Sequence, residues 1–234
     1  MAKLKYGRIV LKLSGEMMSD GDKPLCGESI AASARCVKAL VDEGAQIGVV
    51  VGGGNILRGR SSGGMERNRA DHMGMLATAI NALALQDALL ALGVDCEVMS
   101  AVDMQRFCEP YSSRRANASL DAGKVVVFAC GTGSPFFSTD TGAALKALEV
   151  HADALMLAKS VDAVYSADPA TDPDAVRYSE LSYDETIERN LKATDITTIT
   201  LCRDFNMPIV LFSIEDEGNF VKALYGCNVG TIIS

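Results

Sequence analysis

The stretch IGVVVGGGN at residues 47–55 decides how this chain is interpreted, because an apolar run typical of a strand ends in three consecutive glycines. Gly52, Gly53 and Gly54 lack a Cβ, so their backbone can adopt positive φ and a bulky ligand can approach it closely. Successive N–H groups at the end of a strand form a nest for anions, most often phosphate. One glycine would suffice for a tight turn out of a buried strand. Three glycines therefore favour a binding role for this loop.

Short apolar runs recur along the chain and predict its architecture. Strands are expected at residues 8–13, 46–51, 96–99, 124–130, 154–158, 208–212 and 231–233. Most of these runs are continuously apolar, as in strands that are covered on both faces. Apolar residues at helical spacing predict helices that end near Gly44 and Gly93, and a third helix at about 140–149. This alternation predicts an α/β fold, a three-layer α/β/α sandwich with a mostly parallel central sheet, in a single domain over residues 1–234.

Composition restricts the classes of partner. The formal net charge is −8 with a pI near 4.8, and no run of Lys and Arg approaches five residues, so a nucleic-acid partner is not expected. The seven cysteines are odd in number and lack C-x-x-C spacing, which favours reduced thiols in a reducing compartment. The first residues lack a signal-type apolar core and no apolar stretch of membrane-spanning length is evident. We therefore expect a cytoplasmic protein without a membrane partner.

Candidate binding residues follow several predicted strands, at the edge where open α/β sheets bind ligands. Lys12 lies inside an apolar strand, so its ammonium group must reach solvent or meet an anion. Residues 131–140 follow the strand 124–130 and carry glycines and hydroxyls that could wrap a ligand, with Thr139 or Asp140 as the cap of the next helix. The alternative for this segment is a capped loop with two buried phenylalanines. We favour the binding role because the segment repeats the strand, glycine and helix order of the first loop.

Residues 164–183 have little periodicity and are predicted to form a long ordered loop, a kind of segment that is usually functional in compact domains. With Asp162 just before it, this loop offers the aromatic face of Tyr165 and the carboxylate of Asp168 to a ligand.

Several common site classes are disfavoured by the motifs that are missing. The sequence contains no Walker loop, and no G-x-G-x-x-G opens a strand–helix unit, so a P-loop enzyme and a nicotinamide-dependent Rossmann enzyme are not supported. Two histidines, His72 and His151, leave few candidates for the base of a hydrolase triad or for a Cys/His zinc site.

Five segments, taken in order, resemble the bacterial uridylate kinases of the amino acid kinase family. They are residues 12–16 (KLSGE), 52–55 (GGGN) with Arg58 and Gly59, 71–77 (DHMGMLA), 131–137 (GTGSPFF) and 161–169 (VDAVYSADP). The glycine loop is shared across amino acid kinases, whereas residues 71–77 and 131–137 are specific to uridylate kinases. The resemblance covers essentially the whole chain. It implies transfer of the γ-phosphoryl group of ATP to UMP, which gives UDP.

The resemblance also implies roles for individual residues. Lys12, Arg58 and Asp140 would be catalytic. The ATP-binding residues would be Lys12, Leu13, Ser14, Gly15, Gly54, Arg58, Lys159, Tyr165 and Asp168. The UMP-binding residues would be Gly53, Asp71, Thr132, Gly133, Ser134, Pro135, Phe136, Phe137, Ser138 and Thr139. No direct metal ligand is expected, because Mg²⁺ would be bound through the ATP phosphates.

The chemistry agrees with this inventory. Phosphoryl transfer needs in-line positioning and charge neutralisation more than covalent catalysis. The acceptor phosphate has a second pKa of about 6, so it is already anionic at neutral pH and requires no general base. Lys12 would neutralise charge on the transferred group, and Arg58 could contact phosphate oxygens in a bidentate way. The resemblance adds a magnesium role for Asp140 and a ribose contact for Asp71.

The sequence departs from the family pattern in places and leaves alternatives open. Ala163 stands where relatives usually have glycine, and the ATP contact could fall on Lys159 or Ser160. Residues 19–27 differ from the effector-sensing sequences of relatives; GTP activation, UTP inhibition and a homohexamer are implied by the family alone. Two rival functions remain, a same-fold kinase for a small carboxylate or carbamate and a non-catalytic nucleotide sensor. The segments 71–77 and 131–137 speak against the first, and the retained Lys12, Arg58 and Asp140 against the second.

Overall fold

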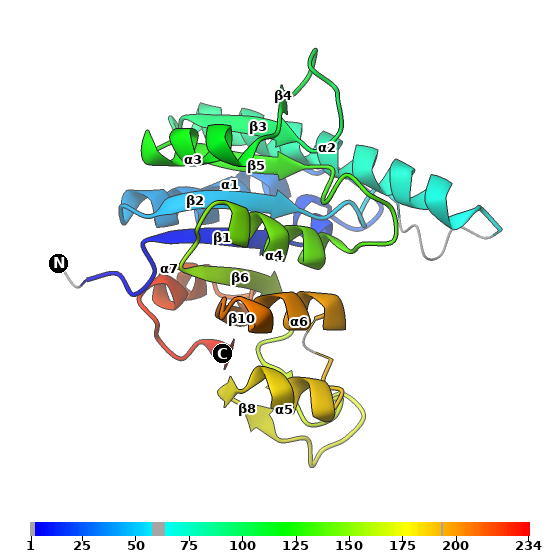
Figure 1. Cartoon of the computed structure of the whole chain (residues 1–234), viewed down its shortest axis with the longest axis vertical. Coiled ribbons are helices and arrows are strands. Elements are labelled where there is room, and N and C mark those ends of the chain that lie inside the picture. The colour runs from blue at the N-terminus through cyan, green and yellow to red at the C-terminus, as the bar shows by residue number, and fades with distance from the viewer. Residues whose placement is uncertain (1–2, 58–63, 193) are drawn as a thin grey trace.

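The computed structural model describes residues 3–57, 64–192 and 194–234, and these residues form a large central sheet between two layers of helices (Figure 1). The sheet has the strand order β4-β3-β5-β2-β1-β6-β10-β11-β9. Its strands are β1 (Arg8–Leu13), β2 (Gln46–Val51), β3 (Cys96–Ser100), β4 (Glu109–Pro110), β5 (Val125–Ala129), β6 (Ala154–Lys159), β9 (Glu180–Leu181), β10 (Ile209–Ser213) and β11 (Gly230–Ile233). Neighbouring strands are parallel except for β10 and β11. The mostly parallel sheet predicted from the apolar runs is confirmed.

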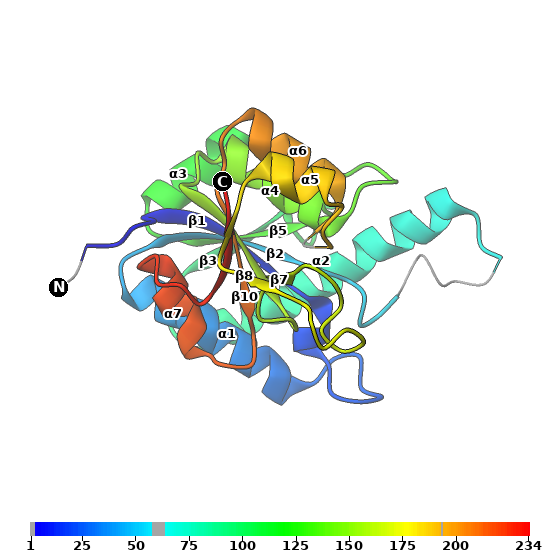
Figure 2. The same ribbon diagram turned by 90° about the horizontal axis from the view of Figure 1, so that it is seen from below.

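Helices cover both faces of this sheet, as the view from below shows (Figure 2). One layer contains the 3-10 helix η1 (Gly15–Met18), α1 (Gly27–Asp42), α2 (Arg67–Ala91) and α7 (Gly218–Leu224). The other layer contains α3 (Ser113–Asp121), α4 (Thr139–Glu149), α5 (Tyr183–Glu188) and α6 (Ile196–Asp204). The molecule is therefore the three-layer α/β/α sandwich that the sequence predicts.

Strand alternation divides the core into two clusters, one on each face. In β1, Ile9, Leu11 and Leu13 pack on the side of α1, α2 and α7, whereas Val10 packs on the side of α3, α4 and α6. Successive side chains of a strand point to opposite faces, so Lys12 shares the face of Val10. Because α4 covers that face, the ammonium group of Lys12 is directed toward the first turn of α4.

The strands and long helices were predicted more accurately than the short elements. The bounds of β1 and β2 agree with the prediction residue for residue, and the other five predicted strands differ by one or two residues. The single loop predicted for residues 164–183 is wrong in part. The segment contains β7 (Val164–Tyr165) and β8 (Arg177–Tyr178), which pair antiparallel with each other, and β9, which joins the central sheet. Two-residue strands are too short to show a period in the sequence.

The helix α2 differs from the sequence expectation about membrane-spanning length. Among the described residues it is the one helix that is long and apolar enough to cross a membrane by length and composition alone. A single helix of this kind is weak evidence for a membrane span, because core helices of soluble proteins pass the same test. In this fold α2 packs against α1 and against β2, β3 and β5. The seven cysteines are all free thiols, and five of them are buried.

Candidate functional site

A cavity of about 850 Å³ opens at the carboxyl ends of the central strands. Its wall is formed by the last residues of β1 and β6, the glycine loop after β2, the N-terminal half of α2, the segment between β5 and α4, and the connection between α5 and α6. The carboxyl edge of a parallel sheet is the usual ligand site in open α/β folds. The volume lies in the upper part of the range for ligand pockets.

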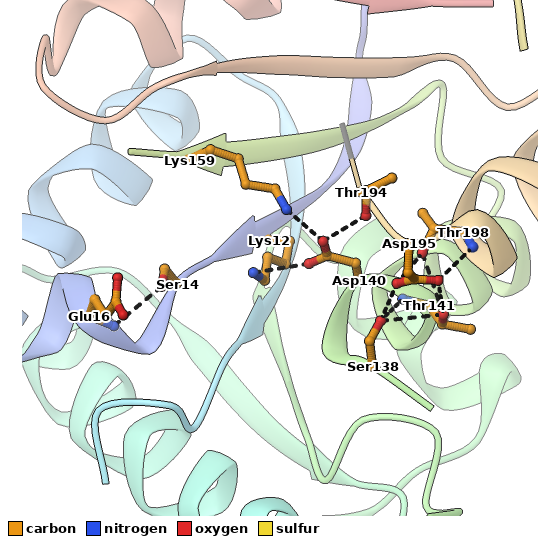
Figure 3. Close-up of polar contacts among 10 residues, drawn as sticks. All are labelled: Lys12, Ser14, Glu16, Ser138, Asp140, Thr141, Lys159, Thr194, Asp195 and Thr198. Atoms are coloured by element: carbon orange, nitrogen blue, oxygen red, sulfur yellow. Dashed lines mark hydrogen bonds and ion pairs between the residues drawn. The ribbon is translucent and has the colours of Figure 1, made fainter. Parts of the chain in front are cut away.

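Three charged side chains meet at the floor of the cavity (Figure 3). Lys12 Nζ lies 2.9 Å from Asp140 Oδ1, and Lys159 Nζ donates a hydrogen bond of 2.6 Å to Asp140 Oδ2. Lys12 comes from β1, Lys159 from the neighbouring β6, and Asp140 from the first turn of α4. Two ammonium groups around one carboxylate leave a net charge of +1, which favours an incoming phosphate group.

The two carboxylate oxygens of Asp140 have different environments. Oδ2 accepts hydrogen bonds from Lys159 Nζ and from Thr194 Oγ1, at 2.6 and 2.7 Å. Oδ1 forms the ion pair with Lys12 but accepts no hydrogen bond from any described residue, although the atom is buried. The Lys12 contact is therefore an ion pair without hydrogen-bond geometry. A buried acceptor of this kind is uncommon in folded proteins and indicates a place where a ligand or a bound ion completes the site.

The ionised form of Asp140 is stabilised despite its burial. Desolvation by burial would raise the pKa of this carboxyl, but the charges of Lys12 and Lys159 and the hydrogen bonds from Lys159 and Thr194 outweigh it. The result is a pKa well below the ordinary value for aspartate. Asp140 is therefore a fixed negative charge at neutral pH, and its role is to hold the two ammonium groups in place rather than to transfer a proton.

The cap of α4 is Ser138, not Thr139 or Asp140 as the sequence suggested. The Ser138 side chain accepts a hydrogen bond of 3.0 Å from Thr141 N, and Thr139 is already the first helical residue. Serine is among the preferred N-cap residues for this geometry. The shift by one position matters, because it places Asp140 at the second residue of α4. There the positive end of the helix dipole favours a carboxylate.

The glycine loop uses its missing side chains for close approach instead of unusual dihedral angles. None of Gly52, Gly53 and Gly54 has positive φ, so that part of the sequence argument is wrong. A Cβ on Gly53 would lie 2.9 Å from Gly74 O and 2.9 Å from Ala77 Cβ of α2, whereas a Cβ on Gly54 would meet nothing within 4 Å. Gly53 is therefore required by the packing against α2, and Gly54 leaves open space for a ligand.

A buried asparagine fixes the same loop from below. Asn81 on α2 is fully buried and donates a hydrogen bond of 2.6 Å to Gly52 O and one of 2.8 Å to Asn55 Oδ1. Asn55 in turn donates to Asn81 Oδ1 and to Pro24 O. These bonds satisfy polar groups that would otherwise be costly to bury. They hold the loop in one position against α2.

Asp71 connects α2 to the segment between β5 and α4. Its Oδ2 accepts a hydrogen bond of 2.8 Å from Phe136 N and forms an ion pair of 2.7 Å with Arg67 Nε. Phe136 has φ of 73°, a value that is strained for a residue with a bulky side chain. The hydrogen bond to Asp71 thus holds an unfavourable backbone conformation at the mouth of the cavity.

Comparison with known proteins places this site in a family. A model of the amino acid kinase family matches residues 7–213. The chain belongs to the amino acid kinase family. Three solved structures of nucleotide kinases are similar to it over nearly their full length. The UMP kinase from Bacillus anthracis is 34% identical with a TM-score of 0.94, covering 98% of this chain and 96% of that chain.

The other two similar structures agree. The UMP kinase from Ureaplasma parvum is also 34% identical, with a TM-score of 0.93 and coverage of 98% of this chain and 99% of that chain. The uridylate kinase from Archaeoglobus fulgidus is 28% identical, with a TM-score of 0.74 and coverage of 97% and 99%. The fold expected from the sequence resemblance is therefore confirmed, and this amino acid kinase is similar to UMP kinases along its whole length.

Most of the predicted site residues of this amino acid kinase line the cavity. They are Lys12, Ser14, Gly15, Gly53, Gly54, Asp71, Thr132, Ser134, Phe137, Ser138, Thr139, Asp140 and Lys159. Of the two candidates for the ATP contact, Lys159 is a lining residue. Phe136 and Phe137 are 64% and 52% exposed, so the alternative of a capped loop with two buried phenylalanines is wrong. Arg58, predicted to be catalytic and to bind ATP, lies outside the described residues.

Other predicted residues are not among those that line the cavity. Leu13, Gly133, Pro135, Phe136, Tyr165 and Asp168 form this group. The Leu13 side chain is in the hydrophobic core. The Tyr165 hydroxyl donates to Asp162 Oδ1, and the Asp168 carboxylate accepts from Ala170 N within its own turn. A role for these three residues in ATP binding stays a prediction.

Sequence reasoning missed one wall of the cavity, the connection between α5 and α6. Asn190, Leu191, Lys192, Thr194 and Asp195 of this connection all line the cavity. The available signal was an aspartate followed by the apolar and threonine-rich run ITTIT at residues 196–200, which is typical of a capped helix start. Nothing in that signal indicates which distant residue the connection contacts.

The residues present fit a magnesium ion that is held mainly by a substrate. Within residues 3–57, 64–192 and 194–234, no group of three or more His, Cys, Asp or Glu could hold a metal ion. Asp140 Oδ1 is nevertheless a buried oxygen without a hydrogen bond among the described residues. Magnesium in kinase sites is usually bound by one or two carboxylates together with substrate phosphates and waters. One free carboxylate oxygen beside a phosphate-sized space meets that requirement.

Proposed function

We propose that this chain is an ATP-dependent UMP kinase, which transfers the γ-phosphoryl group of ATP to UMP and releases ADP and UDP. The observation that carries the proposal is the cluster of Lys12, Asp140 and Lys159 beside the glycine loop in one cavity. Similarity to UMP kinases over 96% or more of their length supports the choice of substrate.

The side chains would act mainly by charge and position. The acceptor phosphate is anionic at neutral pH, so the reaction needs neutralisation of charge instead of a base. Lys12 and Lys159 would neutralise the transferred group and the phosphates of ATP, and Asp140 would hold both ammonium groups at fixed positions. Backbone N–H groups near Gly15 and Gly54 would add dipoles that need no reorganisation during the reaction. Arg58 would contact phosphate oxygens as the sequence predicts.

Magnesium would bind through the ATP phosphates, and Asp140 is the carboxylate that could reach it or its water shell. When bound, the ion supplies neutralisation of phosphate charge. The pKa of Asp140 is low enough that this oxygen is ionised throughout the neutral range, so it needs no deprotonation before the ion binds.

The UMP side of the cavity would be formed by Gly53, Asp71 and residues 132–139. Asp71 would accept hydrogen bonds from the ribose hydroxyls, and residues 132–139 would read the uracil. Uracil N3–H is a donor where cytosine N3 is an acceptor. A mismatched polar pair that is buried costs about 1–3 kcal/mol, so UMP would be preferred over CMP by about 10-fold or more.

The deciding experiment is a panel of phosphate acceptors with ATP and Mg²⁺, in which UMP, CMP and glutamate are compared by the amount of ADP formed. We expect rapid UDP formation from UMP, slower reaction with CMP and none with glutamate. Phosphorylation of glutamate would favour the carboxylate kinase, and binding of ATP and UMP without UDP formation would favour the sensor. Repeating the UMP reaction with GTP and UTP tests the activation and inhibition that we also propose.

We further propose that the enzyme is a cytoplasmic homohexamer. The support is the face of α2 that carries Leu76, Ile80 and Leu90, which are 56%, 46% and 53% exposed. Apolar residues that are exposed at i, i+4 spacing on one helix are typical of a surface that another subunit covers.

A further inference from the structure

The hydroxyl of Thr194 enters the catalytic cluster from an element that carries none of the predicted residues (Figure 3). Thr194 Oγ1 donates a hydrogen bond of 2.7 Å to Asp140 Oδ2, which also accepts the hydrogen bond from Lys159 Nζ. Thr194 lies on the connection between α5 and α6, 54 residues after Asp140 in the sequence. Two donors on one oxygen set the rotation of the carboxylate, and this rotation directs Oδ1 toward Lys12.

The next residue anchors Thr194 in place. The Asp195 carboxylate accepts hydrogen bonds from Thr198 N at 3.0 Å and from Thr141 Oγ1 at 2.9 Å, and it also accepts from Ser138 Oγ. Asp195 is the N-cap of α6, and Ser138 is the N-cap of α4. A single carboxylate therefore joins the first turns of two helices. The position of Thr194 relative to Asp140 is fixed by this junction.

We propose that Thr194 is a positioning residue for phosphoryl transfer, acting through Asp140 on Lys12 and Lys159. The inference rests on the proposed kinase function for its kinetic consequence. Without the hydroxyl, Asp140 Oδ2 keeps the Lys159 hydrogen bond alone, and the carboxylate can rotate about its χ2 bond, which has a broad energy profile. The two ammonium groups would then be held less accurately where charge develops in the transition state. Small losses of positioning of this kind lower turnover more than ground-state binding.

The test compares three variants in the same assay. Thr194→Val removes the hydroxyl and keeps the shape, Thr194→Ser restores the hydroxyl, and Thr200→Val is the matched control. Thr200 belongs to α6, and its hydroxyl bonds to the backbone carbonyls of Ile196 and Thr197. For Thr194→Val we expect kcat to fall about 10-fold, the amount that one hydrogen bond to a charged group is worth. The KM values for ATP and UMP should change less than about 2-fold, and Thr194→Ser should recover most of kcat.

A readout that does not need activity separates the inference from the proposed function. The ¹³C chemical shift of the Asp140 carboxyl should move in Thr194→Val, return in Thr194→Ser and stay unchanged in Thr200→Val. Wild-type protein that makes no UDP would overturn the kinase proposal, and this chemical shift would still decide the contact. An unchanged Asp140 shift in Thr194→Val overturns the inference, as does a Thr194→Val variant with wild-type kcat. Equal losses of kcat in Thr194→Val and Thr194→Ser would also overturn it.

Discussion

The ammonium group of Lys12 reaches the cavity because the strand around it alternates strictly between two apolar faces. Ile9, Leu11 and Leu13 belong to one core cluster, and Val10 to the other. The face of Val10 and Lys12 is closed by α4, whose first turn supplies Asp140. A lysine in an apolar strand is thus matched by a carboxylate from the layer above it. Removing either partner would leave an uncompensated buried charge, which is strongly unfavourable.

Lys12→Ala should lower kcat for UDP formation at least about 100-fold, because one preorganised charge near the transferred group is worth this much. Lys38→Ala is the matched control, since Lys38 pairs with Asp42 on the surface of α1. The measurement is steady-state kinetics together with circular dichroism to verify the fold. A folded Lys12→Ala variant with near-normal turnover would refute the catalytic role.

Neighbouring glycines give a second pair of variants. Gly53→Ala forces a Cβ to within 2.9 Å of Gly74 O, whereas Gly54→Ala meets nothing within 4 Å. We expect Gly53→Ala to lower the free energy of unfolding by about 1–3 kcal/mol, as overpacking usually does, and Gly54→Ala to change it by less than about 0.5 kcal/mol. Urea denaturation measures both. Equal stability of the two variants would contradict the packing argument.

Asp71 offers a test of substrate assignment. Asp71→Asn keeps an oxygen acceptor for Phe136 N but removes the charge that pairs with Arg67. We expect the KM for UMP to rise about 10-fold, which corresponds to the loss of one charged hydrogen bond, while the KM for ATP changes less than about 2-fold. Glu66→Gln, at the exposed N-cap of α2, serves as the control. A similar change in both KM values would count against Asp71 as a UMP contact.

At the scale of elements, the sequence predicted what depends on local pattern and missed what depends on meetings between distant segments. The strands β1 and β2 were predicted with correct bounds, because continuous apolar runs bounded by glycine are informative in themselves. The residues Lys12, Asp140 and Lys159 were assigned to the site through the family resemblance. Thr194 and Asn81 were not, because nothing in a single sequence pairs Thr194 with Asp140 or Asn81 with Gly52.

The junction of β1, β6 and α4 predicts a dependence of stability on pH. The pKa of Asp140 in the folded protein is lower than in the unfolded chain, where aspartate titrates near about 3.9. A depressed carboxyl pKa contributes stability that is complete above about pH 4 and is lost as the pH falls below it. In Asp140→Asn this part of the acid-induced decline should be missing.

The measurement is the free energy of unfolding by urea between pH 3 and pH 7. Asp87→Asn is the control, because Asp87 is exposed on α2 and should leave the wild-type decline unchanged. If Asp140→Asn shows the same decline as wild type below about pH 4, the ion cluster does not contribute to folding stability.

At the scale of the whole molecule, one continuous sheet carries both halves of the chain. Its order runs from β4 through β1 to β9, so residues from the N-terminal and the C-terminal half share the same cavity. This continuity supports the prediction of a single domain over residues 1–234, which stays a prediction. The layer that contains α2 also has the exposed apolar face described above.

Assembly can be tested on that face. Light scattering coupled to size exclusion should give a mass near six times the 24.7 kDa of one chain. Replacing Leu76 and Ile80 together by glutamate should reduce this mass, because it places charges in the proposed interface. Leu25→Glu, on an exposed loop, should not. A monomer in wild type, or an unchanged mass in the double variant, would contradict the interface.

The pairing of β1 has a consequence for refolding. Lys12 lies opposite Val50 of β2 and Leu157 of β6. A slip of β1 by one residue would turn Lys12 to the face of α1 and place a leucine at the floor of the cavity. Such a molecule would keep its strand content and remain compact, yet it would be catalytically silent. Enzymatic activity recovered after refolding therefore counts the molecules in which β1 has inserted in its native register, which spectroscopic measures of secondary structure do not distinguish.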